Sequence, residues 1–176
     1  MVFDELLAGL APFKNLIFLT LALLGPLLFF HIGQLFGLER RYEPQFWGRL
    51  GLCLFLFMTA SAHFTDPMAM AVMLPEFVPF REYIVVLTGF LEIGLGLAVL
   101  YNPVTRLMGW AIIAMLIGFL PANIYAALNY IPFGGAEMGP AYLLVRVPYQ
   151  AFLAGFAFWT TQTGQHASTK RFGQLA

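Results

Sequence analysis

The chain has 176 residues, of which 60% are hydrophobic and 10% are charged, whereas a soluble domain carries about 25% charged residues. Nine basic and nine acidic residues balance, and no basic stretch is interleaved with aromatic residues, which excludes nucleic-acid binding. The single cysteine, Cys53, permits neither an internal disulfide nor a Cys-x-x-Cys redox pair within this chain. The composition predicts an all-α integral membrane protein.

Five apolar stretches are each about long enough to form a transmembrane helix, which needs about 20 residues. In chain order they cover residues 13–37, 47–64, 82–101, 107–128 and 147–163. The first stretch follows Asp4 and Glu5 rather than a basic segment, so we interpret it as a retained helix and not as a signal peptide. We expect an N-terminal helix with a basic cytoplasmic loop (1–46), a four-helix membrane domain (47–163) and a C-terminal cytoplasmic tail (164–176).

The basic residues predict the orientation of these spans, because short loops rich in Lys and Arg stay in the cytoplasm. One side of the five-span topology carries Lys14, Arg81 and Arg146. The other side carries Arg40, Arg41, Arg49, Arg106, Lys170 and Arg171. The excess on the second side places the N-terminus outside and the C-terminus in the cytoplasm.

Residues 66–80 are apolar but short and contain three prolines. This composition favours an interfacial or re-entrant segment at the outer mouth of the bundle over a further span. Its methionines suit a variable apolar ligand, although a loop lying among lipid headgroups explains the same pattern.

Glu92 lies about ten positions into the third predicted span, near the middle of the bilayer. A charge at that depth costs about 2.5–3.5 kcal/mol on insertion scales, so its carboxyl group requires partners. Helical spacing puts Thr88 and Gly89 on the same face as Glu92, which we expect to face the bundle interior. Ligand binding or proton transfer is one role for Glu92, and a protonated carboxyl group that joins two helices is the alternative.

Further polar residues fall in the same predicted outer half. We expect them to form one hydrogen-bonded pocket with Glu92 and Thr88, with Arg146 as counter-ion to Glu92 or Asp66. The alternative for Arg146 is a side chain that merely extends to the membrane surface. These additional pocket residues are His63, Asp66, Asn123, Arg146, Tyr149 and Gln150.

No metal or haem site is predicted. His63, Asp66 and Glu92 lack a recognised ligand spacing. His31 and His63 fall near opposite ends of their spans, too far apart for two axial ligands of one haem.

Six motifs from residue 63 onward resemble the DoxX family of small bacterial membrane proteins. They are HFTDP (63–67), PEFVP (75–79), TGFLEIGLGL (88–97), NPVTR (102–106), PANIYAAL (121–128) and RVPYQ (146–150). The resemblance implies a four-helix transmembrane core in the bacterial cytoplasmic (inner) membrane. That core is distantly similar to the EXPERA-type domain of sterol isomerases, which holds a lipid-like ligand beside acidic residues.

The family positions that carry over are His63, Glu92, Asn123, Arg146 and Gln150. The extra N-terminal helix departs from the four-span pattern, and we expect it to contact a partner or a second copy of the chain. DoxX-type proteins include components of oxidoreductase systems such as a thiosulfate:quinone oxidoreductase, so the resemblance implies a redox partner protein and a quinone as a candidate cofactor.

Three hypotheses follow for the function. The first is a membrane subunit that binds a small apolar molecule, a quinone or a lipid, around Glu92 and works with a redox protein. The second is an isomerase-like enzyme that uses Glu92 and His63 as acid and base on an unsaturated lipid. The third is an assembly factor or chaperone for another protein, without a small-molecule substrate.

Overall fold

The computed structural model describes residues 14–37 and 43–163, and the regular secondary structure of this part of the chain is all helical, as the sequence predicts. It contains six α-helices and one 3-10 helix. Their bounds are α2 Lys14–Leu35, α3 Pro44–Thr65, α4 Pro67–Ala71, α5 Arg81–Ala98, α6 Thr105–Leu128, η2 Ala136–Met138 and α7 Pro140–Gln162.

Local sequence explains where several helices begin. Pro44 and Pro140 stand at the start of α3 and α7, where the missing N–H of proline removes no helical hydrogen bond. Asp66 caps α4, because its side chain accepts a hydrogen bond from the backbone N–H of Ala69 at 3.1 Å. Residues 66–80 therefore form a short capped helix and a loop, in place of a further long helix.

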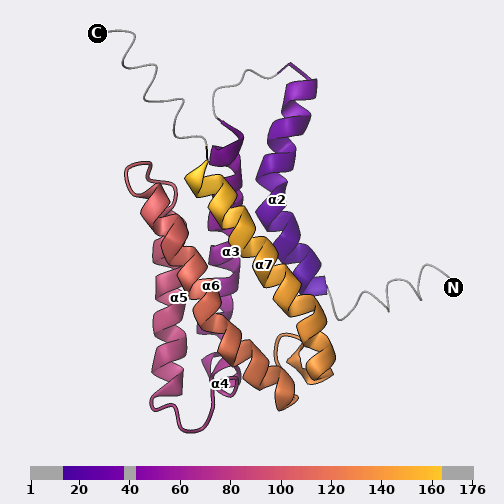
Figure 1. Cartoon of the computed structure of the whole chain (residues 1–176), viewed down its shortest axis with the longest axis vertical. Coiled ribbons are helices and arrows are strands. Elements are labelled where there is room, and N and C mark those ends of the chain that lie inside the picture. The colour runs from indigo at the N-terminus through magenta and orange to yellow at the C-terminus, as the bar shows by residue number, and fades with distance from the viewer. Residues whose placement is uncertain (1–13, 38–42, 164–176) are drawn as a thin grey trace, which may run out of the picture.

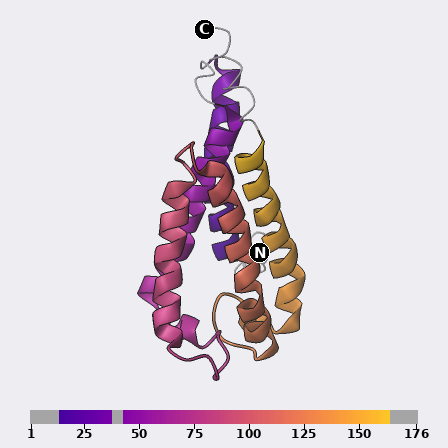
Figure 2. The same ribbon diagram turned by 60° about the vertical axis from the view of Figure 1, so that its left-hand side comes forward.

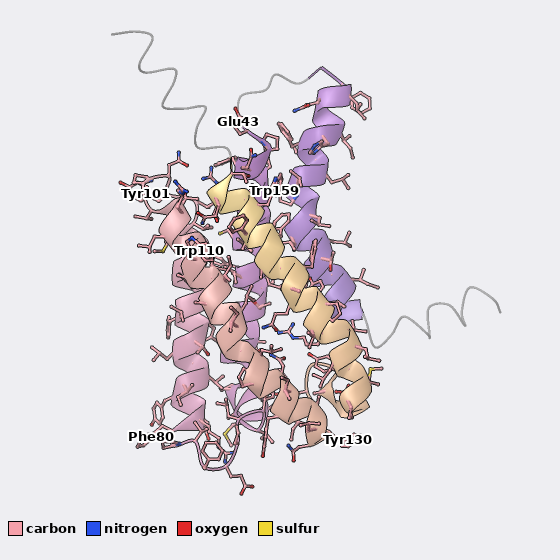
Figure 3. All side chains as sticks on the ribbon, viewed as in Figure 1. Glu43, Phe80, Tyr101, Trp110, Tyr130 and Trp159 are labelled. Carbon is pink, nitrogen blue, oxygen red and sulfur yellow. The ribbon has the colours of Figure 1, made fainter. Side chains whose placement is uncertain are left out.

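The five long helices lie side by side, and the short α4 lies at one end of the bundle (Figure 1). Helix α3 packs against α2, α5 and α7, while α6 packs against α5 and α7. In Figure 2, α5 and α7 lie on either side of α6. Figure 3 labels the two ends: Phe80 and Tyr130 mark the "α4 end", and Glu43, Tyr101, Trp110 and Trp159 mark the "Trp159 end".

The surface of the bundle is apolar. Large hydrophobic side chains such as Leu35, Leu87 and Leu144 are 84%, 69% and 79% exposed, an arrangement that water does not favour but lipid does. Three helices are long and apolar enough to cross a membrane, namely α2 from Asn15 onward, α6 and α7. The chain is therefore a multi-pass membrane protein.

The other two long helices, α3 and α5, coincide with expected spans but do not meet the same requirements of length and composition. Helix α3 contains Arg49 and His63, and α5 contains Arg81, Glu82 and Glu92. Five long helices occur where five spans are expected, and three of them satisfy the requirements for a span by length and composition. The spans of α3 and α5 stay a prediction.

Four of the basic residues that predict the orientation lie outside the described part of the chain. These are Arg40 and Arg41 of the predicted basic loop, and Lys170 and Arg171 of the predicted tail at 164–176. The sidedness of the bundle therefore stays a prediction.

Helices approach most closely where glycine replaces a side chain. A Cβ atom at Gly51 of α3 would overlap the backbone oxygen of Leu23 in α2, and one at Gly109 of α6 would overlap the hydroxyl of Thr161 in α7. A Cβ at Gly48 would lie 2.5 Å from the methyl carbon of Thr160. These contacts hold α2, α3, α6 and α7 together in the half of the bundle toward the Trp159 end.

Candidate functional site

A partly open cavity of about 980 Å³ occupies the half of the bundle toward the α4 end. Its walls come from six helices and two loops. They are the first turns of α2, the second half of α3, α4 with the loop after it, α5 as far as Glu92, α6 from Met115 to Asn123, and α7 as far as Leu153 with the loop before it. Most lining side chains are apolar. The polar ones on which the site depends are Thr59, His63, Thr88, Glu92, Asn123 and Arg146.

Glu92 is 4% exposed and lies against two side chains of α3. Its Oε1 lies 3.5 Å from Nε2 of His63, which is 5% exposed. Its Oε2 lies 2.7 Å from the hydroxyl of Thr59. Because Thr59 and His63 are four residues apart on one helix, both face the same carboxyl group. The carboxyl group therefore has the partners that its depth in the bundle requires.

The partners of the His63 ring fix its protonation pattern. Its Nδ1 lies 2.7 Å from the backbone carbonyl of Val85, which can only accept a hydrogen bond, so Nδ1 carries a hydrogen. The Nε2 atom then faces Glu92 either as a donor to a carboxylate or as an acceptor from a carboxyl group. The two side chains can thus share one proton between them.

Thr88 and Gly89 explain how α5 brings Glu92 beside His63. The Thr88 hydroxyl lies 3.1 Å from Nδ1 of His63 and donates to the carbonyl of Val85 at 2.8 Å. A Cβ at Gly89 would lie 2.7 Å from Cβ of His63, so glycine is needed for this close approach. The face of α5 that we predicted to point inward does face α3.

Asn123 and Arg146 form a second polar group in the cavity wall. Asn123 of α6 donates through Nδ2 to the carbonyl of Phe119 at 2.7 Å and accepts from Nε of Arg146 at 3.1 Å. Within the described residues, no ion pair of 4.0 Å or less joins Arg146 to Glu92 or to Asp66. The partner of Arg146 is an amide in place of the expected carboxylate, because Asn123 stands opposite it on the neighbouring helix.

Three residues of the expected pocket make contacts elsewhere and do not line the cavity. Asp66 is exposed and caps α4. Tyr149 places its hydroxyl 3.1 Å from that of Thr20 in α2. Gln150 is 6% exposed and donates to the backbone carbonyl of Leu116. The sequence places all three at suitable depths along the bundle, but none of the three lies on the side of its helix or helix cap that lines the cavity.

Thr59 and helix α2 form part of the cavity wall, although neither contribution was predicted from the sequence. Thr59 precedes His63 by four residues, and this spacing was the available signal. Asn15, Leu16 and Leu19 of α2 line the cavity, but no sequence pattern indicates which partners an apolar helix contacts. The N-terminal helix thus forms part of the cavity wall.

No group of three or more His, Cys, Asp or Glu side chains with the geometry of a metal site lies within residues 14–37 and 43–163. The cavity residues are instead suited to hydrogen bonding and proton exchange.

A family model described as a domain of unknown function (DUF8561) matches residues 52–161. The chain belongs to this family. The matching family is not DoxX, whose motifs the sequence resembles. No curated protein and no solved structure matches the chain. The matched region contains Thr59, His63, Glu92, Asn123 and Arg146, and it excludes α2.

Proposed function

We propose that this membrane protein binds a small, largely apolar molecule, a lipid or a quinone, in the cavity toward the α4 end. Glu92 and His63 exchange a hydrogen bond or a proton with the polar group of that molecule. The observation that carries the proposal is a buried carboxyl–imidazole pair in the wall of a cavity of about 980 Å³. Ligand sites typically enclose about 300–1,000 Å³ and combine apolar walls with a few polar groups.

Burial supports a functional role for the pair. Two ionisable groups in a low-dielectric interior are costly to keep, and hydrophobic residues of similar volume would stabilise a bundle equally well. A pair that only joined α3 to α5 would not need to border a cavity. Here both side chains line it, and Met70 and Met73 near α4 provide adaptable apolar contacts for a ligand.

The finer parts of the proposal draw on the DoxX-like motifs. All five long helices cross the bacterial inner membrane in this proposal, with the α4 end outside, and the chain is the membrane subunit of an oxidoreductase system with a separate redox protein. This part of the proposal is supported by four residues that each belong to one of those motifs and line the cavity. They are His63, Glu92, Asn123 and Arg146.

The test of ligand binding is a Glu92→Gln variant. Glutamine preserves the shape and the contact with Thr59 but cannot give up or accept the carboxyl proton. Glu43→Gln is the matched control, because Glu43 is exposed at the Trp159 end. We expect native mass spectrometry in a mild non-ionic detergent to find a bound molecule in the wild type and in Glu43→Gln, and about tenfold lower occupancy in Glu92→Gln. Equal occupancy in all three proteins would contradict the proposal.

A membrane enzyme is the second candidate, favoured by the 3.5 Å separation of His63 and Glu92, which lets an acid and a base act side by side. It predicts that the purified chain alone isomerises an unsaturated lipid and that Glu92→Gln abolishes this turnover. If a client protein instead co-purifies without any small molecule, both candidates are wrong and the assembly-factor hypothesis is favoured.

A further inference from the structure

We propose that the ligand is an anionic amphiphile. Arg146 binds its carboxylate or phosphate head, and the rest of the molecule extends along the cavity so that an uncharged polar group on it reaches Glu92 and His63. This inference rests on the proposed function and adds the chemical class of the ligand. Its basis is the difference between the two polar groups in the cavity wall, one of which is satisfied within the protein and one of which is not.

The first polar group is satisfied. Both oxygens of Glu92 have a partner, one in His63 and one in Thr59. The second ring nitrogen of His63 is held by the carbonyl of Val85. When its carboxyl and imidazole groups share one proton, this pair has no net charge and does not require a charged ligand.

Arg146 differs, because within the described residues one of its three nitrogens has a hydrogen bond. Its Nε donates to Asn123, while neither terminal nitrogen contacts an acceptor there, and no carboxylate lies within 4.0 Å. A guanidinium group stays charged and presents its donors as a planar fork that matches carboxylate and phosphate oxygens. The contact from Asn123, itself held by Phe119, keeps that fork oriented in the cavity wall.

Glu137 is an internal carboxylate that could compete for Arg146, since it also belongs to the cavity lining. Its carboxylate is exposed and accepts a hydrogen bond from the backbone N–H of Gly135 at 3.1 Å. It forms no ion pair with Arg146. An exposed carboxylate is well hydrated and gains little from pairing, which leaves the cation available to a ligand.

The depths of the two groups fit an amphiphile that enters from one leaflet. Arg146 lies six residues into α7 and Glu92 eleven residues into α5, both counted from the α4 end. At about 1.5 Å per residue these positions are about 9 Å and about 17 Å along their helices. An anionic head at Arg146 therefore stays near headgroup depth, while the rest of the molecule reaches toward Glu92 in the middle of the bundle.

The experiment compares ligands that share one tail and differ in their heads. The wild-type protein in a maltoside detergent is titrated with oleate, with an oleoyl lysophosphatidate and with uncharged oleyl alcohol, and affinities are measured by calorimetry. We expect at least one anionic amphiphile to bind about tenfold or more tightly than oleyl alcohol, and the tighter of the two assigns the head. Inorganic phosphate is titrated separately to test whether a head without a tail suffices.

Variants of Arg146 test whether this residue binds the anionic head. Arg146→Gln should remove the preference for the anionic head without changing the affinity for oleyl alcohol, and Arg146→Lys should retain part of it because lysine lacks the planar fork. Arg106→Gln is the matched control, since Arg106 is exposed near the other end of the bundle, where it contacts Gln162. Melting temperatures of all variants check that each one is folded.

Equal affinity of the wild type for oleyl alcohol and both anions would overturn this inference and leave the proposed function standing. Binding of inorganic phosphate as tightly as lysophosphatidate would also overturn it, because the site would then take a free anion. If no amphiphile binds and native mass spectrometry finds no molecule in the wild type, the proposed function itself is wrong.

Discussion

The two halves of this bundle are built differently. Toward the Trp159 end, the backbone of one helix meets a side chain of its neighbour at Gly48 and Gly109, and the backbone of its neighbour at Gly51. Toward the α4 end, the same helices separate around a cavity of about 980 Å³. Close contacts in the half toward the Trp159 end hold the helices in place, so that the cavity in the other half does not close.

The polar side chains follow the same division. In the packed half, the hydroxyls of Thr105, Thr160 and Thr161 donate to nearby backbone carbonyls, and Arg49 donates to Thr105 at 3.3 Å. In the hollow half, Glu92 and Arg146 border open space. Polar groups in the first half bond to the protein itself, whereas those in the second half also line the cavity.

The largest effect is expected from a methyl group in the packed half. Gly51→Ala places a Cβ against the backbone oxygen of Leu23, which cannot move aside as a flexible side chain would. We expect a loss of about 1–3 kcal/mol or more in the free energy of unfolding, measured as a lower melting temperature in detergent. Gly94→Ala is the control, since nothing lies within 4 Å of its Cβ position. If both variants melt alike, the α2–α3 contact does not hold the packed half together.

Filling the cavity should affect binding and leave folding intact. Gly118 lines the cavity and has nothing within 4 Å of its Cβ position, so the side chain of Gly118→Phe starts in open space. We expect about tenfold or weaker ligand binding, with a melting temperature close to that of the wild type. Gly155→Phe provides the matched control, because that site is equally open but does not line the cavity. Unchanged binding in Gly118→Phe would place the ligand elsewhere.

A smaller effect is expected when one partner of Glu92 is removed. Thr59→Val keeps the side-chain shape and deletes the hydroxyl that lies 2.7 Å from Oε2. We expect a loss of about 0.5–1.5 kcal/mol in unfolding free energy and a several-fold change in ligand affinity. Thr65→Val on the exposed end of the same helix should change neither quantity. Equal behaviour of the two variants would mean that Thr59 does not support the carboxyl group.

The smallest effect is expected at the contact that attaches α2 beside the cavity. Tyr149→Phe removes the hydroxyl that lies 3.1 Å from that of Thr20. Hydrogen bonds between transmembrane helices average about 0.6 kcal/mol, so the melting temperature should fall only slightly. Tyr83→Phe, at a side chain that is 76% exposed, is the control. A loss as large as that of Gly51→Ala would show that α2 is held mainly through Tyr149.

Local pattern alone predicted much of the fold. Residues 107–128 were expected to form a helix, and α6 spans Thr105–Leu128, because an apolar run of that length satisfies its backbone internally in any apolar environment. The inward face of α5 also followed from the spacing of Thr88, Gly89 and Glu92. The glycine contacts did not, since glycine is equally small wherever it points.

The sequence by itself determined that the chain is a multi-pass helical membrane protein and that Glu92 needs partners, because hydrophobicity and charge act on each segment separately. Only the tertiary structure decided who the partners are. In the structure, Glu92 contacts Thr59 and His63, and Arg146 contacts the amide of Asn123 where a carboxylate was expected. Three other residues of the predicted pocket do not line the cavity, namely Asp66, Tyr149 and Gln150. The physical reason is that helical spacing fixes depth and face, whereas the rotation of each helix against its neighbours depends on packing along its whole length.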